Sequence, residues 1–65
     1  MEKKNEELAR FLCRNELRTF LNCTNGTKLN GFIKECGSNF LIFDDKMLDQ
    51  QIVFFEEIEE IEEDG

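Results

Sequence analysis

A chain of 65 residues can form only one domain, and such a domain buries about 60% of the surface that its unfolded form exposes. Domains this small usually depend on disulfides, a metal or partner subunits. The net charge of −7 opposes ordinary nucleic-acid binding, and no apolar run approaches the roughly 20 residues of a membrane span. No signal peptide opens the chain, so we expect a cytoplasmic protein with no membrane partner.

Three cysteines do not supply the missing support. Cys13, Cys23 and Cys36 are odd in number, have no CxxC spacing and are accompanied by no His. Neither a disulfide framework nor a zinc site fits that pattern. We expect reduced, partly buried thiols, no metal and no cofactor, which leaves oligomerisation as the stabilising device.

The charge is divided unevenly along the chain. Residues 1–34 hold seven Lys and Arg against four Glu, whereas residues 35–65 hold one Lys against eleven acids. A sheet built from this chain would therefore carry one basic and one acidic surface.

The pattern predicts a helix over about residues 2–15. Leu8, Phe11 and Leu12 recur on one helical face, and Asn15 is a reasonable stop. Arg10, Arg14 and Arg18 follow the helix toward its end. They would form either a phosphate-gripping edge or a solvated helix face, and the second is the commoner case for arginines at this spacing.

A hairpin is predicted next, with a strand over residues 19–24. Asn25-Gly26 is a strong tight-turn signal because both residues tolerate positive φ. The following strand, residues 28–34, alternates between apolar and polar side chains. Gly31 interrupts it, and a glycine there predicts a bulge or a sharp bend.

Two further β-rich runs follow without an intervening helix. Residues 40–43, Phe-Leu-Ile-Phe, indicate a buried strand, residues 44–46 a polar turn, and residues 50–55 another strand. One helix followed only by short strands predicts antiparallel pairing that closes toward a small barrel.

The C-terminal stretch allows two interpretations. Phe54, Phe55, Ile58 and Ile61 have the spacing of an amphipathic helix, whereas a strand would place Ile58 and Ile61 on opposite faces. A one-turn break near residues 56–57 would let two strands share the segment. Residues 62–65 predict a short, disordered acidic tail.

Two motifs stand out, Asn-Gly-x-Lys-Leu-x-Gly at residues 25–31 and Gln-Gln-Ile-Val-Phe at residues 50–54. Together with the order of the predicted elements, they resemble the Hfq-type RNA chaperones of the Sm/LSm-like family. The resemblance covers about residues 8–61. It implies a single mainly β domain over residues 1–65, in which one N-terminal α-helix (2–15) caps a small, bent, five-stranded antiparallel barrel (18–61). It also implies a homo-oligomeric ring, hexameric in the bacterial branch, joined through edge strands, and a last strand from Ile58 to about Glu62.

The resemblance assigns RNA contacts to two ring faces and a rim. The face that takes purine-rich single strands matches at Gly26, Thr27, Lys28, Asn30 and Gln51, but its base-stacking aromatic falls at Asn22. The face around the pore usually carries Tyr-Lys-His, and here these positions are Phe54, Phe55 and Glu56, so Glu56 and Glu57 would make the pore mouth negative. The stacking Phe of that face falls on Asn39, or on Phe40 if the turn has one extra residue, which fits the spacing to Gln-Gln better. On the rim, Arg14 is the best match, beside Arg10 and Arg18.

Two functions follow from this resemblance. The first is a ring-forming RNA-binding protein, acting as an RNA chaperone or post-transcriptional regulator, with altered chemistry near the pore and a preference for purine-rich over uridine-rich RNA. The second is a ring that acts mainly through protein contacts, or that modulates a conventional Hfq by mixed assembly. The intact turn favours the first and the negative pore the second; we place the first ahead. An enzyme is not expected, because His, a Gly-rich phosphate loop and a Ser-centred motif are all missing.

Overall fold

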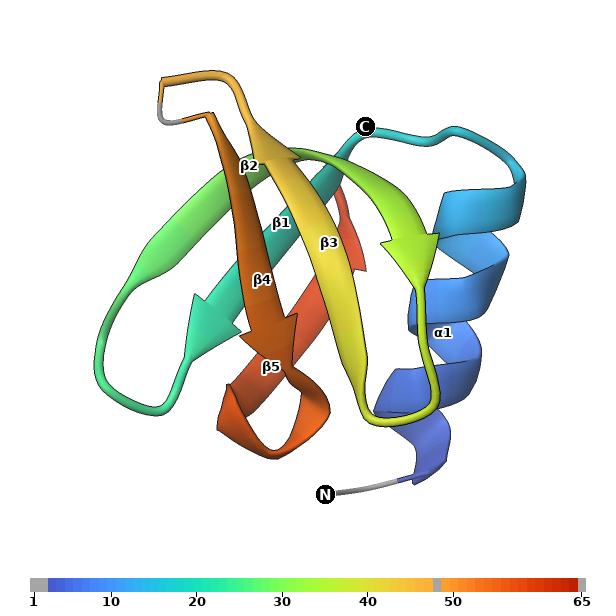
Figure 1. Cartoon of the computed structure of the whole chain (residues 1–65), viewed down its shortest axis with the longest axis horizontal. Helices are drawn as coiled ribbons and strands as arrows, with labels where there is room; N and C mark the ends of the chain where they lie inside the picture. The colour runs from blue at the N-terminus through green and yellow to red at the C-terminus, as the bar shows by residue number, and fades with distance from the viewer. Residues whose placement is uncertain (1–2, 48, 65) are drawn as a thin grey trace.

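One helix is followed by five strands in the computed structural model, which describes residues 3–47 and 49–64 (Figure 1). The expected fold class is confirmed: the protein is mainly β with one N-terminal helix. The elements are α1 (Lys3–Arg14), β1 (Thr19–Cys23), β2 (Lys28–Cys36), β3 (Phe40–Asp45), β4 (Gln50–Phe54), the 3₁₀ turn η1 (Phe55–Glu57) and β5 (Ile58–Glu63).

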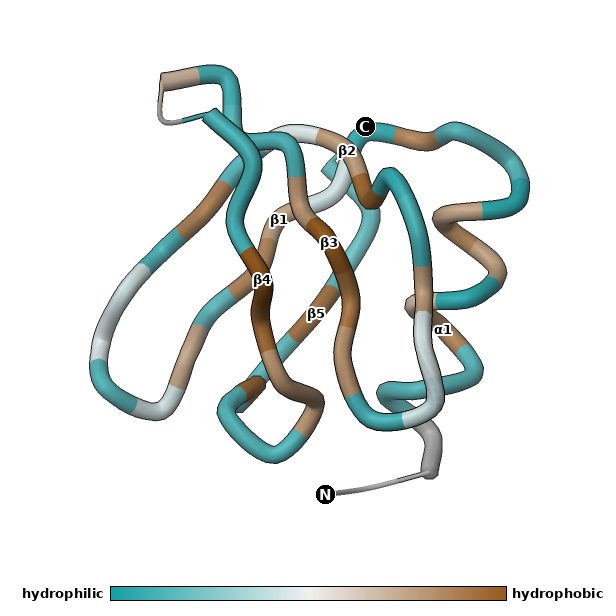
Figure 2. The backbone as a smooth tube through the Cα atoms, viewed as in Figure 1, coloured by the Kyte–Doolittle hydropathy of each residue, from teal (hydrophilic) through white to brown (hydrophobic). Residues whose placement is uncertain are grey.

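The strands form one antiparallel sheet in the order β4-β3-β2-β1-β5. The sheet bends around a core that includes Leu21, Leu41 and Phe43, and α1 packs beside it against β2 and β5 (Figure 1). The most apolar backbone lies in the middle of β3 and β4, while β5 alternates with polar residues (Figure 2). Strands β4 and β5 lie at the two ends of the sheet, so each presents an edge. None of the described helices is long and apolar enough to cross a membrane.

Helix α1 buries a slightly different face from the one predicted. Ala9 and Leu12 are fully buried, whereas Phe11 is 47% exposed and lies outside the buried stripe. The helix ends in a Schellman motif: the N–H groups of Glu16 and Leu17 donate to the carbonyls of Cys13 and Leu12, with Glu16 at φ 52°. The stop expected at Asn15 is therefore close to the observed end.

The β1–β2 turn differs from the predicted two-residue turn. The N–H of Gly26 donates to the carbonyl of Cys23, and the N–H of Cys23 donates to the carbonyl of Thr27, which leaves a three-residue loop. Gly26 has φ 93°, but Asn25 does not have positive φ. A three-residue loop needs the left-handed conformation only at its last residue, so glycine is required at one position and not two.

Gly31 permits a close approach of two strands. It pairs with Asp45 of β3 and Thr19 of β1, and a Cβ built on it would overlap the backbone carbonyl of Asp44. The bulge expected near Gly31 lies further along, because the β2–β3 register shifts between Ile33 and Glu35. Glycine thus brings the backbones together, and the bulge follows it.

Strand β3 is less buried than predicted. Leu41 and Phe43 point into the core, but Phe40 and Ile42 are only half-buried on the other face. The polar turn predicted at residues 44–46 is also shorter, since β3 continues to Asp45. The Asp45 carboxylate is buried and accepts hydrogen bonds from the N–H groups of Asn30 (2.9 Å) and Met47 (2.8 Å), which fixes the β3–β4 turn against β2.

The C-terminal ambiguity is settled by a break and a bulge. The 3₁₀ turn η1 separates β4 from β5, and the register between β1 and β5 shifts between Asn22 and Cys23. The shift lets Ile58 and Ile61 both face the core, although strict alternation predicts opposite faces. The strand also includes Glu62 and Glu63, which we expected in a disordered tail, while Gly65 lies outside the described residues.

Candidate nucleic-acid interface

The β1–β2 turn lies beside the start of β4. Thr27 and Gln51 line one hollow of about 200 Å³, together with Asn25 and Glu57. The structure therefore brings together two residues that are far apart in the chain and that the family resemblance assigns to the same RNA-binding face. Gly26 stands in the turn itself, between the lining residues Asn25 and Thr27.

The outer face of β1, β2 and β5 continues from this turn, and we call it the turn face. Its side chains form two rows across the strands, Lys28–Asn22–Glu60 and Asn30–Phe20–Glu62. Lys28 is exposed, whereas Asn22 and Asn30 are half-buried. The predicted contacts Lys28 and Asn30 thus share one surface, with carboxylates along its β5 side.

Carboxylates hold the donor ends of both asparagines on the turn face. The Nδ2 of Asn22 donates to Glu60 Oε1 at 3.3 Å, and the Nδ2 of Asn30 donates to Asp64 Oδ2. The Oδ1 atoms of both amides are buried and have no hydrogen-bond partner within residues 3–47 and 49–64. The carboxylates thus hold both amides at their surface side, and the buried oxygens are not open to a ligand.

Phe20 is a turn-face residue that the sequence analysis missed. It is half-buried between Asn30 and Glu62, while its strand neighbours Thr19 and Leu21 are fully buried. Strand alternation alone would have placed it on the same face as Asn22. An aromatic side chain is thus present on this face, one row away from the position where the resemblance puts one.

Two aromatic residues assigned to the other ring face also lie together. Phe40 pairs with Phe54 across β3 and β4, and Ile42 pairs with Ile52 two residues further along the same outer face. Phe54 is 44% and Ile52 65% exposed, so this is an open apolar strip along the edge strand.

Phe55 does not stand on the surface as its alignment with a family lysine implied. It is 2% exposed in the core, with the Arg10 guanidinium 5.9 Å from its ring centroid. Glu56 is exposed, whereas the Glu57 carboxylate accepts a hydrogen bond from the N–H of Phe54 at 3.2 Å. Of the positions aligned with Tyr-Lys-His, only Phe54 and Glu56 therefore offer side chains to a partner.

The three rim arginines do not form one continuous edge. Arg10 donates to the carbonyl of Gly37 at 3.2 Å and lies 3.7 Å from the Glu6 carboxylate, so it holds α1 against the barrel. Arg18 lies over the Phe32 ring, 5.8 Å from its centroid. Arg14 is exposed near the end of α1.

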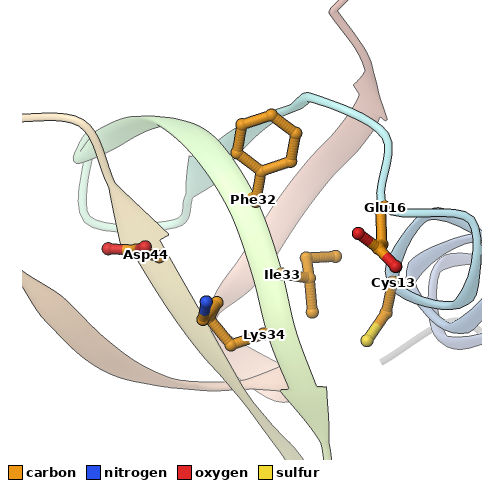
Figure 3. A pocket seen from close by; sticks show the side chains of 6 residues that line it. All are labelled: Cys13, Glu16, Phe32, Ile33, Lys34 and Asp44. Atoms are coloured by element: carbon orange, nitrogen blue, oxygen red, sulfur yellow. The ribbon is translucent and has the colours of Figure 1, made fainter.

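A groove that the sequence did not predict lies between the end of α1 and β2 (Figure 3). Its volume is about 470 Å³, and its lining mixes one basic and two acidic side chains with apolar ones: Cys13, Glu16, Phe32, Ile33, Lys34 and Asp44. The mixed charge gives it no preference for an anionic strand.

Two of the three cysteines line these hollows: Cys13 lines the groove, and Cys23 lines the hollow beside the β1–β2 turn. All three are free, and the described residues contain no group of three or more metal-ligating side chains. Burial, with Glu57 as a second cause, raises the pKa of Cys23. Burial and the neighbouring Cys13 raise the pKa of Cys36 to about 11.

This raised pKa predicts a loss of stability in alkali. Between the ordinary value of 9.0 and about 11 the unfolded chain releases the Cys36 proton while the folded chain keeps it, so the free energy of unfolding falls with rising pH. Below that interval the Cys36 thiol is protonated in both the folded and the unfolded chain, and its contribution to the free energy of unfolding is fully present. Urea unfolding under a reductant should show a smaller alkaline fall for Cys36→Ser than for the parent; equal falls would contradict the assignment.

Comparison with known proteins identifies the fold alone. No protein-family model matches the sequence, and no curated protein matches it. Among solved structures, the crystal structure of the pleiotropic translational regulator Hfq is similar, with a TM-score of 0.76 over 91% of this chain and 97% of that chain. The two sequences are 14% identical. The five-stranded sheet with its N-terminal helix is therefore the Sm-like fold.

Proposed function

We propose that this Sm-like chain is a cytoplasmic, ring-forming protein that binds single-stranded, purine-rich RNA on its turn face. The observation that carries the proposal is the turn face, where exposed Lys28 lies across from Asn22 and the aromatic Phe20 lies in the next row. Thr27 and Gln51 line the hollow on the other side of the same turn, together with the core residues Leu29 and Val53. A cation for phosphate and an aromatic ring for base stacking therefore lie on adjoining strands. These are the groups that single-strand recognition uses.

Assembly into a closed ring, with six subunits as the expected number, follows from the two sheet edges. Strand β4 carries exposed Ile52 and Phe54 beside unpaired backbone groups, and β5 is the opposite edge. Pairing β4 of one subunit with β5 of the next is a head-to-tail contact, which closes when the rotation between subunits divides a full turn. It would also supply the buried surface that so short a chain lacks.

A second function is favoured by the acids of the turn face. Glu60, Glu62 and Asp64 flank the asparagines, and their negative charge repels phosphate. A ring with this surface suits a basic protein partner, including a conventional Hfq in a mixed ring. A protein that forms the ring but does not bind oligo(A) would favour this second function.

Native mass spectrometry with and without oligo(A) and oligo(U) tests the proposal directly, because it reports subunit number and bound RNA together. We expect a single closed oligomer that binds oligo(A) better than oligo(U). A monodisperse monomer at micromolar concentration, or a ring that binds neither oligonucleotide at low salt, would overturn it.

Lys28→Ala should leave the ring intact and weaken oligo(A) binding. Loss of one phosphate contact should reduce the slope of log affinity against log salt by roughly 0.7 for each subunit engaged. Lys34→Ala is the matched control, because Lys34 is an exposed lysine of the same strand but lies away from the turn. Equal affinities for parent and Lys28→Ala would remove the turn face as the site.

Phe20→Leu should also weaken oligo(A) binding, since leucine keeps the apolar contact and loses the aromatic face. Stacking contributes about 1–3 kcal/mol per base. Phe11→Leu is the control, because Phe11 is 47% exposed on α1, outside the turn face. Fluorescence anisotropy at matched salt would measure both; an unchanged dissociation constant for Phe20→Leu would show that no base stacks there.

A further inference from the structure

Two cysteines meet where the end of α1 crosses the end of β2. Cys13 lies in the last turn of α1 and Cys36 is the last residue of β2. Both are half-buried and both pack against the hydrophobic core, and the neighbouring Cys13 contributes to raising the pKa of Cys36. Figure 3 shows the Cys13 sulfur directed from the helix toward β2.

A separate contact holds the same two segments together. Arg10, one helical turn before Cys13, donates to the carbonyl of Gly37, the residue after Cys36, at 3.2 Å. Cys36 is also paired with Leu41 of β3. The two thiols are therefore carried by elements fixed on both sides, and their proximity does not depend on a mobile loop.

We propose that Cys13 and Cys36 form a dithiol site that small-molecule disulfides oxidise to an intramolecular disulfide, which locks α1 onto the barrel. This inference is independent of RNA binding and of ring assembly. The cysteine count suggested only inert thiols, because sequence spacing does not reveal that residues 13 and 36 meet.

The oxidation proceeds by two thiol–disulfide exchanges. The Cys13 thiolate attacks one sulfur of the small disulfide, which forms a mixed disulfide and releases one small thiol. Cys36 then gives its proton to solvent and attacks the Cys13 sulfur, which releases the second small thiol. Two electrons pass to the small disulfide in total. Because the pKa of Cys36 is about 11, the second step should accelerate as pH rises.

The disulfide would close the loop between residues 13 and 36. Closing a loop restricts the unfolded chain, so the oxidised protein should resist urea more than the reduced protein does. Cys23 is the matched control for formation of this disulfide. It is 8% exposed on β1, and the neighbouring group that raises its pKa is the Glu57 carboxylate rather than a second thiol.

Oxidised glutathione applied to the reduced full-length protein tests the proposal. We expect free thiols to fall from three to one, with a protein two hydrogens lighter and no glutathione attached. Non-reducing trypsin digestion should give peptide 11–14 joined to peptide 35–46. Cys23→Ser should also lose two thiols, whereas Cys13→Ser and Cys36→Ser should stop at a mixed disulfide.

Stability supplies the second measurement. The urea midpoint should rise on oxidation in the parent and in Cys23→Ser, and a reductant should reverse the rise. Three thiols retained by the parent, a stable glutathione adduct without closure, or a disulfide that includes Cys23 or joins two chains would each overturn the proposal. The parent's mass and peptide map decide the matter even if a serine variant fails to fold.

Discussion

Gly31→Val should leave most of the chain unfolded at room temperature. A Cβ at this position overlaps the Asp44 carbonyl oxygen, a backbone atom that cannot move as the end of a side chain can. Relief requires β2 and β3 to separate beside the Asp45 carboxylate that joins their ends. A chain of 65 residues has a total stability of roughly 3–10 kcal/mol, and we expect this substitution to remove most of it.

Far-UV circular dichroism and urea unfolding would measure the loss. Gly26→Ala is the matched control: Gly26 has φ 93° with nothing within 4 Å of the added Cβ, so only backbone strain of about 1–2 kcal/mol is expected. A Gly31→Val protein that unfolds at the parent's urea midpoint would show that the two strands are less close than described.

Ile52→Glu should convert the proposed ring into folded monomers. Ile52 is 65% exposed on the edge strand β4, so the isolated subunit has no need of its side chain. In a β4–β5 subunit contact, a glutamate there would bring a carboxylate against the next subunit's β5, whose exposed residues are all Glu. Such an uncompensated charge costs roughly 3–5 kcal/mol, which corresponds to a dissociation constant raised by roughly two to four orders of magnitude for each contact.

Analytical ultracentrifugation and circular dichroism together would separate assembly from folding. Met47→Glu is the control, because Met47 is 81% exposed but lies in the turn after β3 rather than on the edge strand. If Ile52→Glu retained the parent's oligomer, the β4 edge would not be the interface.

Several features follow from the sequence because they depend on neighbours a few residues apart. Helix α1 and its end near Asn15, the Asn25-Gly26 turn region and the alternation of β2 around Leu29 and Ile33 are local patterns, and each is present in the structure. Hydrogen bonds within a helix or tight turn span three to five residues. Residue type and spacing are therefore enough to specify these elements.

Other features depend on segments that meet only after folding. Ile58 and Ile61 share the core because the β1–β5 register shifts near Asn22, and Gly31 is required because Asp44 passes against it. Thr27 likewise meets Gln51 through the bending of the sheet. Strand register and bend are set by packing across the whole core, and a one-residue shift turns a side chain to the other face. No pattern within a single strand encodes that shift, so only the tertiary structure decides which residues face the core and which form the candidate site.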